Sequence, residues 1–277
     1  MLCLDKFQSG YGGDLNSFWA EIHSKLKYLV GRPQLSVNDY PNNISEDVLF
    51  YLQDCSDEAF LDFVELIFKT NAHSRTGDGT AFDLVEQINN AFLFDDLPYA
   101  LTKFVHERQT RTYYQSEQTY EANVVVAFPQ VIRRENEVAY TEIIEPALTL
   151  LSNKQFTSAN VEFLEALADY RKGDFGDCLT KCGSAFESTM KIICDRKKIP
   201  YEMKDTAKPL VDKLLKEAPN LESYFEQLLM IVATLRNKLS KSHGAGTQQR
   251  TVPPHIAKYA LNMTAATILL LVDGFSP

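Results

Sequence analysis

An excess of positive charge is missing from this sequence. Its 277 residues carry 28 Lys and Arg against 37 Asp and Glu, which gives a formal net charge of -9 at pH 7. A protein that coats nucleic acid through bulk electrostatics is basic, so any contact with nucleic acid here must be local. The hydrophobic fraction of 45% is that of an ordinary globular protein, and the length favours about two domains.

Paired cysteines and an export signal are missing as well. The five cysteines form an odd set without the dense pairing of a small secreted scaffold. Cys178 and Cys182 lie one helical turn apart without a second pair, so we expect buried small residues rather than metal ligands. The N-terminal residues include Asp5 and Lys6 and lack the apolar core of a signal peptide. These features predict a cytoplasmic protein.

Long apolar runs and cofactor motifs are also scarce. The most apolar stretch begins at Ile256, is interrupted by Lys258 and Asn262, and falls short of the roughly 20 residues that span a bilayer. It therefore predicts a buried helix, and we expect no membrane contact. The segment SRTGDGT lacks the Lys-Ser/Thr ending of a P-loop, and no cluster of carboxylates is visible to hold a catalytic metal. We expect no cofactor and no metal.

What the sequence does contain is helical periodicity, with one interruption. Apolar residues recur at steps of three and four from Asp14 to Val30 and in further segments up to about Phe94. From Thr110 onward, TRTYYQ and ANVVVAFP are short and rich in aromatic and β-branched residues, which predicts a small β-hairpin. Helical periodicity then resumes in ENEVAYTEIIEPALTLL.

The pattern breaks again near SNKQFT, where we place a domain junction. Residues 1–152 are predicted to form an N-terminal α-rich domain with short strands, for which we consider a sensor or regulatory role. Residues 153–277 contain about five helices and no strand candidate, so the fold class is mainly α. The helix ends are marked by glycine or proline, at Gly173, Pro200, Pro219, Gly244 and Pro253.

The fourth of these helices carries a pattern suited to phosphate chemistry. Arg236 and His243 lie seven residues apart. That spacing is about two turns, so both side chains share one face roughly 10 Å apart along the axis. His243 precedes Gly244, in a last helical turn where the macrodipole favours the protonated imidazole. A histidine that titrates near cellular pH can act in general acid-base catalysis.

Arg236 supplies the complementary charge for that chemistry. Its planar guanidinium can bind a phosphate and stabilise a pentacoordinate phosphorane, and Asn237 can hydrogen-bond the substrate or orient the arginine. Because RNA carries its own nucleophile, the 2′-hydroxyl, these groups could cleave it to a 2′,3′-cyclic phosphate without a metal. The alternative is a structural role for both residues. An arginine near a helix C-terminus often interacts favourably with the helix macrodipole, and a histidine there can cap the helix.

Local charge favours RNA as the substrate. No Asp or Glu occurs between Glu226 and Asp273, whereas several basic residues do. Like-signed charge in one strip creates a positive potential that can hold an RNA backbone. We therefore expect RNA contacts from Lys238, Lys241 and Arg250.

Two other basic segments have a functional and a structural interpretation. HERQTRTYYQ, with Arg108, Arg111 and Tyr113, could bind single-stranded RNA by stacking, although tyrosines in strands more often simply pack. The Arg133 and Arg134 pair is interpreted as a solvated helix start.

Three segments resemble a known family. The string LRNKLSKSHGAG resembles the signature of HEPN domains, an arginine followed by a polar residue with a histidine near the helix end. The Arg-x6-His spacing is at the long end of that family's usual range. AFESTMKIICDRKK resembles a helix of the abortive-infection C-terminal branch of HEPN proteins, and FPQVIRRENEVAYTEIIEPAL resembles the preceding region of AbiJ-like proteins.

The resemblance implies a C-terminal HEPN-like helical bundle in which Arg236, Asn237 and His243 form the catalytic motif. Glu187 and Lys191 would support it, although a Glu-Lys pair four residues apart is also a routine helix contact. The resemblance further implies a homodimer with a composite active site, an anti-phage abortive-infection effector or toxin, and an antitoxin or defence-system partner. The alternative is a non-catalytic HEPN module that dimerises or binds a nucleotide or a partner protein.

Overall fold

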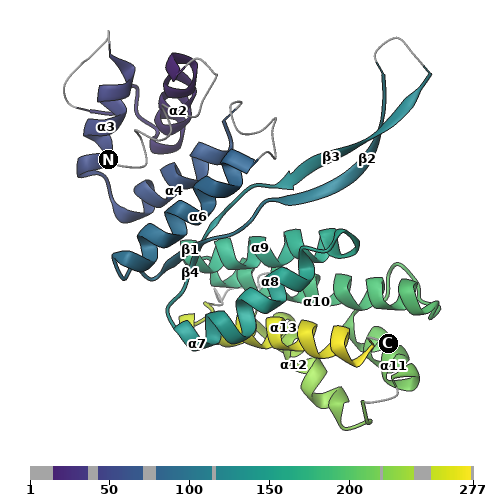
Figure 1. The fold of residues 1–277 in the computed structure, drawn as a ribbon. Helices are drawn as coiled ribbons and strands as arrows, with labels where there is room; N and C mark the ends of the chain where they lie inside the picture. The colour runs from purple at the N-terminus through teal and green to yellow at the C-terminus, as the bar shows by residue number, and fades with distance from the viewer. Residues whose placement is uncertain are drawn as a thin grey trace. The chain divides into compact units, whose positions relative to one another are not determined.

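The protein is mainly helical and divides into two compact units. The computed structural model describes residues 15–36, 43–70, 79–113, 117–218, 221–239 and 251–275. Unit 1 comprises Met1–Phe104 and Ala127–Ile132, and unit 2 comprises Val105–Val126 and Arg133–Pro277 (Figure 1). The predicted fold class is confirmed.

Unit 1 consists of helices and one pair of very short strands. Its described elements are α2 (Leu15–Val30), α3 (Ile44–Asp54), α4 (Asp57–Phe68), α6 (Gly79–Phe94) and β1 (Tyr99–Leu101), which pairs with β4 (Val131–Arg133). The Asn43 and Ser56 side chains accept hydrogen bonds from backbone N–H groups in the first turns of α3 and α4, as N-caps do. The Glu65 carboxylate of α4 accepts a hydrogen bond from the Val131 N–H at 2.9 Å. Side chains as well as helix packing therefore hold the β1–β4 pair.

A cavity of about 440 Å³ lies within unit 1. It is lined by the end of α2, the end of α3 and the first turns of α4, and includes Arg32, Tyr51 and Cys55. Its volume is in the range of small-molecule sites.

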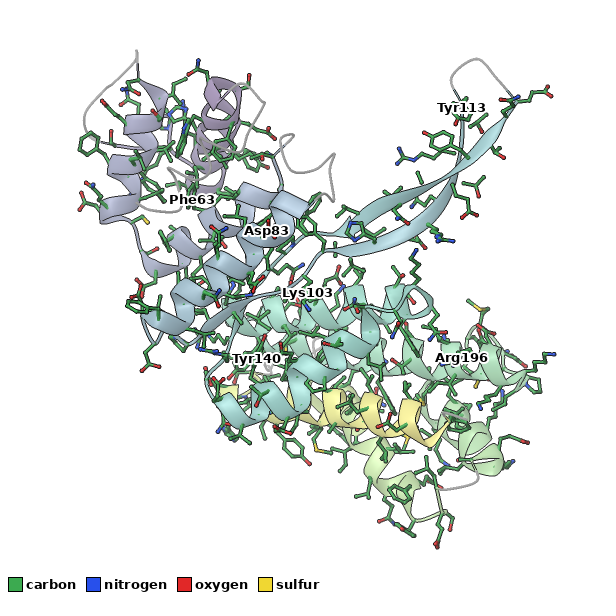
Figure 2. All side chains as sticks on the ribbon, viewed as in Figure 1. Phe63, Asp83, Lys103, Tyr113, Tyr140 and Arg196 are labelled. Carbon is green, nitrogen blue, oxygen red and sulfur yellow. The ribbon has the colours of Figure 1, made fainter. Side chains whose placement is uncertain are left out.

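The predicted hairpin is present and belongs to unit 2. Strands β2 (Val105–Thr112) and β3 (Thr119–Ala127) pair with each other, and the base of β2 contacts the C-terminal helices. Tyr113 is labelled on the hairpin in Figure 2, and its ring centroid lies 4.5 Å from that of Tyr120. Residues 133–152 also pack with unit 2, so the junction expected at 152/153 falls inside this compact unit.

The helices of unit 2 surround one central helix. They are α7 (Glu137–Ala139), the π-helix η1 (Tyr140–Ile144), α8 (Glu145–Leu151), the 3-10 helix η2 (Lys154–Phe156), α9 (Thr157–Lys172), α10 (Phe175–Lys197), α11 (Ala207–Glu217), α12 (Phe225–Leu239) and α13 (Pro254–Gly274). Helix α10 contacts α9, α11, α12 and α13. Gly173 ends α9 with a φ of 80°, as its predicted stop requires. The buried Cys178 and Cys182 thiols lie in α10, and their hydrogen bond together with burial raises the pKa of Cys178.

The apolar helix α13 is the second core element of unit 2. By length and composition alone it could cross a membrane, but half of its most apolar window is buried inside the fold. It contacts α8, α9, α10 and α12, and three of its alanines, Ala257, Ala260 and Ala265, are fully buried. Small side chains let neighbouring helices approach closely, which is consistent with the predicted buried helix.

The π-helix η1 has an identifiable local cause. Pro146 follows directly, at the second position of α8. Because proline has no N–H, it cannot donate to the carbonyl of Glu142, which an α-helix would require. The Glu145 N–H instead bonds to the Tyr140 carbonyl, five residues earlier. Such π segments are rare and occur frequently at functional sites.

Candidate active site

Arg236 and Glu187 form an ion pair between two packed helices. Arg236 lies in the last turn of α12, and Glu187 lies in the second half of α10. Nη1 of Arg236 donates to Oε1 of Glu187 at 2.7 Å, and the two side chains are 24% and 16% exposed. A charge-assisted hydrogen bond of this length in a partly buried position orients the guanidinium strongly. The structure thus brings together two of the five residues predicted as catalytic or supporting.

Gly183 provides the seat for the arginine stem. A Cβ atom at this position would lie 2.4 Å from Cδ of Arg236, closer than non-bonded atoms can approach. Gly183 and Glu187 are four residues apart on α10, so they lie on the same face, one turn from each other. Gly183 therefore leaves room for the aliphatic part of the Arg236 side chain, and Glu187, one turn further along α10, binds its guanidinium.

The guanidinium retains donors beyond the one that Glu187 uses. Its Nε atom is buried and has no acceptor among the described residues. A guanidinium has five N–H donors in a fixed fork, and the hydrogen bond to Glu187 occupies one of them. With about a quarter of the side chain exposed, Arg236 can present the remaining donors to an anion.

A second carboxyl group lies close to this pair. Glu162 of α9 is bonded by the Ser188 hydroxyl of α10, and its Oε2 atom is buried without a partner among the described residues. Burial raises the pKa of the Glu162 carboxyl, and the neighbouring carboxylates of Glu165 and Glu187 raise it further. The site therefore contains a carboxyl group that holds its proton more tightly than an ordinary glutamate.

The other predicted residues divide into those that the structure places and those that it does not. Asn237 and Lys238 are exposed in the last turn of α12. Lys191 donates to the Met203 carbonyl at 2.9 Å, and no described contact joins it to Glu187 or Arg236. The expected Glu187–Lys191 pair is thus replaced by the Glu187–Arg236 pair.

The remaining residues of the predicted site are His243, Lys241 and Arg250, which lie outside the described residues. The pairing of Arg236 with His243 therefore stays a prediction. Lys258, which belongs to the same acid-poor stretch, donates to Glu135 at 2.8 Å and so contributes to a different part of unit 2. Among the residues that the structure describes, no group of three or more His, Cys, Asp and Glu side chains could hold a metal ion.

Sequence reasoning missed two contributors to this site. Gly183 had a detectable signal, because a glycine in the middle of a helix costs up to about 1 kcal/mol and needs a packing reason. Glu162 had none, since its neighbours lie on another helix and nothing in the local sequence singles it out.

Comparison with known families agrees with this geometry. Residues 157–275 match the family model Abi_C, described as a HEPN-like domain. This part of the chain is similar to a HEPN-like domain. The match extends from α9 to α13 and includes both Glu187 and Arg236, so the expected resemblance is confirmed for the C-terminal region. No curated protein and no solved structure matches the chain.

Proposed function

We propose that this protein is an endoribonuclease of the HEPN type that cleaves RNA without a metal ion, with Arg236, Asn237 and His243 as its catalytic motif. The observation that supports the proposal is the way in which the Arg236 side chain is held in place. Its stem lies against Gly183, its head is oriented by Glu187, and part of the guanidinium faces solvent. A preoriented, partly desolvated guanidinium is the group that stabilises charge on a transferring phosphoryl group.

In the proposed reaction the RNA attacks itself. The 2′-oxygen forms a bond to the adjacent phosphorus while the imidazole of His243 accepts the 2′-hydroxyl proton. Arg236 stabilises the pentacoordinate phosphorane, and Asn237 positions the scissile phosphate. The bond from phosphorus to the 5′-oxygen then breaks, and the leaving oxygen takes a proton from water. The products are a 2′,3′-cyclic phosphate and a 5′-hydroxyl end.

The biological role in this proposal follows from the HEPN-like family. We infer a cytoplasmic toxin or abortive-infection effector that acts against phage as a homodimer and is restrained by an antitoxin or a defence-system partner. Unit 1 would then act as the sensor, and its cavity of about 440 Å³ offers a place for a small ligand. Lys238, Lys241 and Arg250 would hold the RNA backbone.

The test is cleavage of end-labelled RNA by the purified full-length protein in excess chelator. We expect cyclic phosphate ends from the wild type and a loss of at least 100-fold, the usual contribution of a general acid-base group, with His243→Ala. Arg236→Lys should be similarly impaired, because an ammonium lacks the planar fork. Arg196→Gln, which removes an exposed positive charge elsewhere on unit 2, is the matched control. Undiminished cleavage by His243→Ala would overturn the assignment.

One observation favours the alternative, a non-catalytic module that dimerises or binds a partner. Glu187 already neutralises the charge of Arg236, as it would in a purely structural pair. If RNA remains intact in the cleavage experiment while the folded protein captures a protein or nucleotide tightly, this alternative holds.

A further inference from the structure

A small cavity lies beside the π-helix η1 in unit 2, away from the Arg236–Glu187 pair. It is formed by the end of β4 and the loop after it, by η1, and by parts of α9 and α13. Its volume is about 50 Å³, several times the roughly 10–15 Å³ that one water molecule needs. Its lining includes the polar side chains of Arg133, Arg134, Asn136, Tyr140, Lys258 and Asn262. We call this cavity the η1 pocket.

Arg134 is the unexpected member of the η1 pocket. Its side chain is only 10% exposed, so the interpretation of Arg133 and Arg134 as a solvated pair is wrong for Arg134. Its Nη1 lies 3.4 Å from Oε2 of Glu137, a residue that is 61% exposed. Its Nε is buried and has no acceptor among the described residues. A buried donor without a partner costs about 1–3 kcal/mol, and an unseen ion or water is a usual explanation.

The other charges of the η1 pocket are arranged around one carboxylate. Glu135 accepts from Nζ of Lys258 at 2.8 Å, and its other oxygen lies 3.3 Å from Arg133. The bond from Lys258 lowers the pKa of Glu135, which therefore stays ionised. The lining thus carries three cations and one carboxylate, and with Glu137 beside Arg134 the excess is one positive charge in a protein that is acidic overall.

Tyr140 adds a neutral donor on the first turn of η1 (Figure 2). Burial raises the pKa of Tyr140 to about 12, so its hydroxyl stays protonated at any cellular pH. The guanidinium carbon of Arg134 lies 6.0 Å from the centre of the Tyr140 ring, which keeps the arginine side chain beside η1. The π-helix therefore places an aromatic donor next to a guanidinium whose Nε has no acceptor among the described residues.

We propose that the η1 pocket binds a terminal phosphate group, held by Arg134 and supported by Lys258 and Tyr140. A guanidinium fork matches both carboxylates and phosphates. The number of donors decides between them, since a phosphate monoester offers three strong acceptor oxygens, one for each of Arg134, Lys258 and Tyr140, whereas a carboxylate offers two. Such a group can come from the 5′ end of an RNA chain or from a free nucleotide. This inference does not depend on the proposed cleavage reaction.

The first experiment measures binding to the full-length protein by calorimetry at constant ionic strength. We expect saturable binding of inorganic phosphate and AMP, and none of adenosine. Arg134→Gln should weaken phosphate binding at least tenfold, whereas Arg196→Gln, which removes one positive charge well away from the pocket, should not (Figure 2). Lys258→Gln, at a position that is 42% exposed, tests the same pocket if Arg134→Gln fails to fold. Saturable binding that neither pocket substitution weakens, or no saturable binding at all, would overturn the proposal.

The second experiment separates the two sources of phosphate. Short RNAs with a 5′-phosphate or a 5′-hydroxyl are compared with AMP on the His243→Ala variant. Tighter binding of the 5′-phosphorylated RNA than of AMP identifies an RNA end, and equal affinity identifies a free nucleotide. If both RNAs bind equally and only Arg236→Lys weakens them, the phosphate contacts lie at the candidate active site and the η1 pocket has no such role.

Discussion

At the scale of single residues, the contact between Gly183 and Arg236 makes a sharp prediction. Gly183→Ala improves the intrinsic helix propensity of α10 by about 1 kcal/mol. It also places a methyl group where Cδ of Arg236 now lies. We expect the free energy of unfolding to change by less than about 1 kcal/mol while RNA cleavage falls at least tenfold, because the arginine must leave its seat. Urea denaturation and the cleavage assay measure the two effects separately.

Ser184→Ala is the control for this substitution. Ser184 neighbours Gly183, and its hydroxyl bonds back to the Thr180 carbonyl of the same helix. Removing that hydroxyl should leave cleavage unchanged. If the Gly183→Ala variant cleaves RNA like the wild type, the contact of Arg236 with Gly183 is not needed for cleavage, and Arg236 acts from another conformation.

Glu162 predicts a pH dependence of stability. Burial raises the pKa of its carboxyl above the ordinary value of 4.5, so the folded state favours the protonated form. The stabilising effect of that proton is complete below pH 4.5 and is lost as the pH rises through the folded pKa. Glu162→Gln should therefore raise the free energy of unfolding at pH 7 by about 1 kcal/mol. The gain should shrink toward pH 4.5, as urea denaturation at both pH values would show.

Glu165→Gln is the matched control for this pH dependence. Glu165 lies one turn further along α9, its side chain is 42% exposed, and it pairs with Lys181. Its removal should give no gain at pH 7. An equal gain from both substitutions would mean that general charge repulsion, rather than burial of Glu162, sets the effect.

At the scale of helices and strands, periodicity predicted most of the fold. The long helices α9 and α10 end within a few residues of the predicted stops at Gly173 and Pro200, and α13 begins directly after Pro253, because glycine and proline mark these boundaries. The strands β1 and β4 were missed, since three residues are too few for an alternating pattern. The π-helix was missed because its cause, one absent N–H at Pro146, does not change the hydrophobic pattern.

The C-terminus of α10 offers a test of local backbone strain. Lys198 follows the helix with a φ of 58°, in the left-handed region that favours glycine. Lys198→Gly should stabilise the protein by roughly 0.5–1 kcal/mol, since glycine adopts this conformation without a steric penalty. Thermal unfolding of this variant measures the gain. Lys197→Gly, one residue earlier and inside the helix, should instead destabilise the protein by a similar amount. A loss of stability with Lys198→Gly would contradict the account.

At the scale of the whole molecule, sequence reasoning located a break in the pattern but not the partners of each segment. SNKQFT interrupts the helical periodicity, yet the structure places η2 there and packs α8 on the same unit as α9. The hairpin joins unit 2 because β2 contacts α9, a relation between segments some 50 positions apart. Local sequence patterns report periodicity and stops, not such long-range contacts.

The same limit applies to the active site. Arg236 and His243 were predicted together because one helical face relates them, whereas Glu187 entered through the family resemblance and Gly183 not at all. The ion pair of Arg236 with Glu187 joins residues 49 positions apart, on α12 and α10.

The proposed composite site makes activity depend on the pairing of chains. If two copies share one site, the protein should sediment at twice the 31.4 kDa of a single chain. Its activity per chain should fall on dilution below the dimer dissociation constant, because dissociation separates the contributing residues. An excess of the His243→Ala variant should then inhibit the wild type, since most wild-type chains would pair with an inactive copy. An equal excess of an unrelated protein should not. Full activity of wild-type chains in that excess would mean that each chain carries a complete site, and Arg236 and His243 would have to meet within one HEPN-like domain.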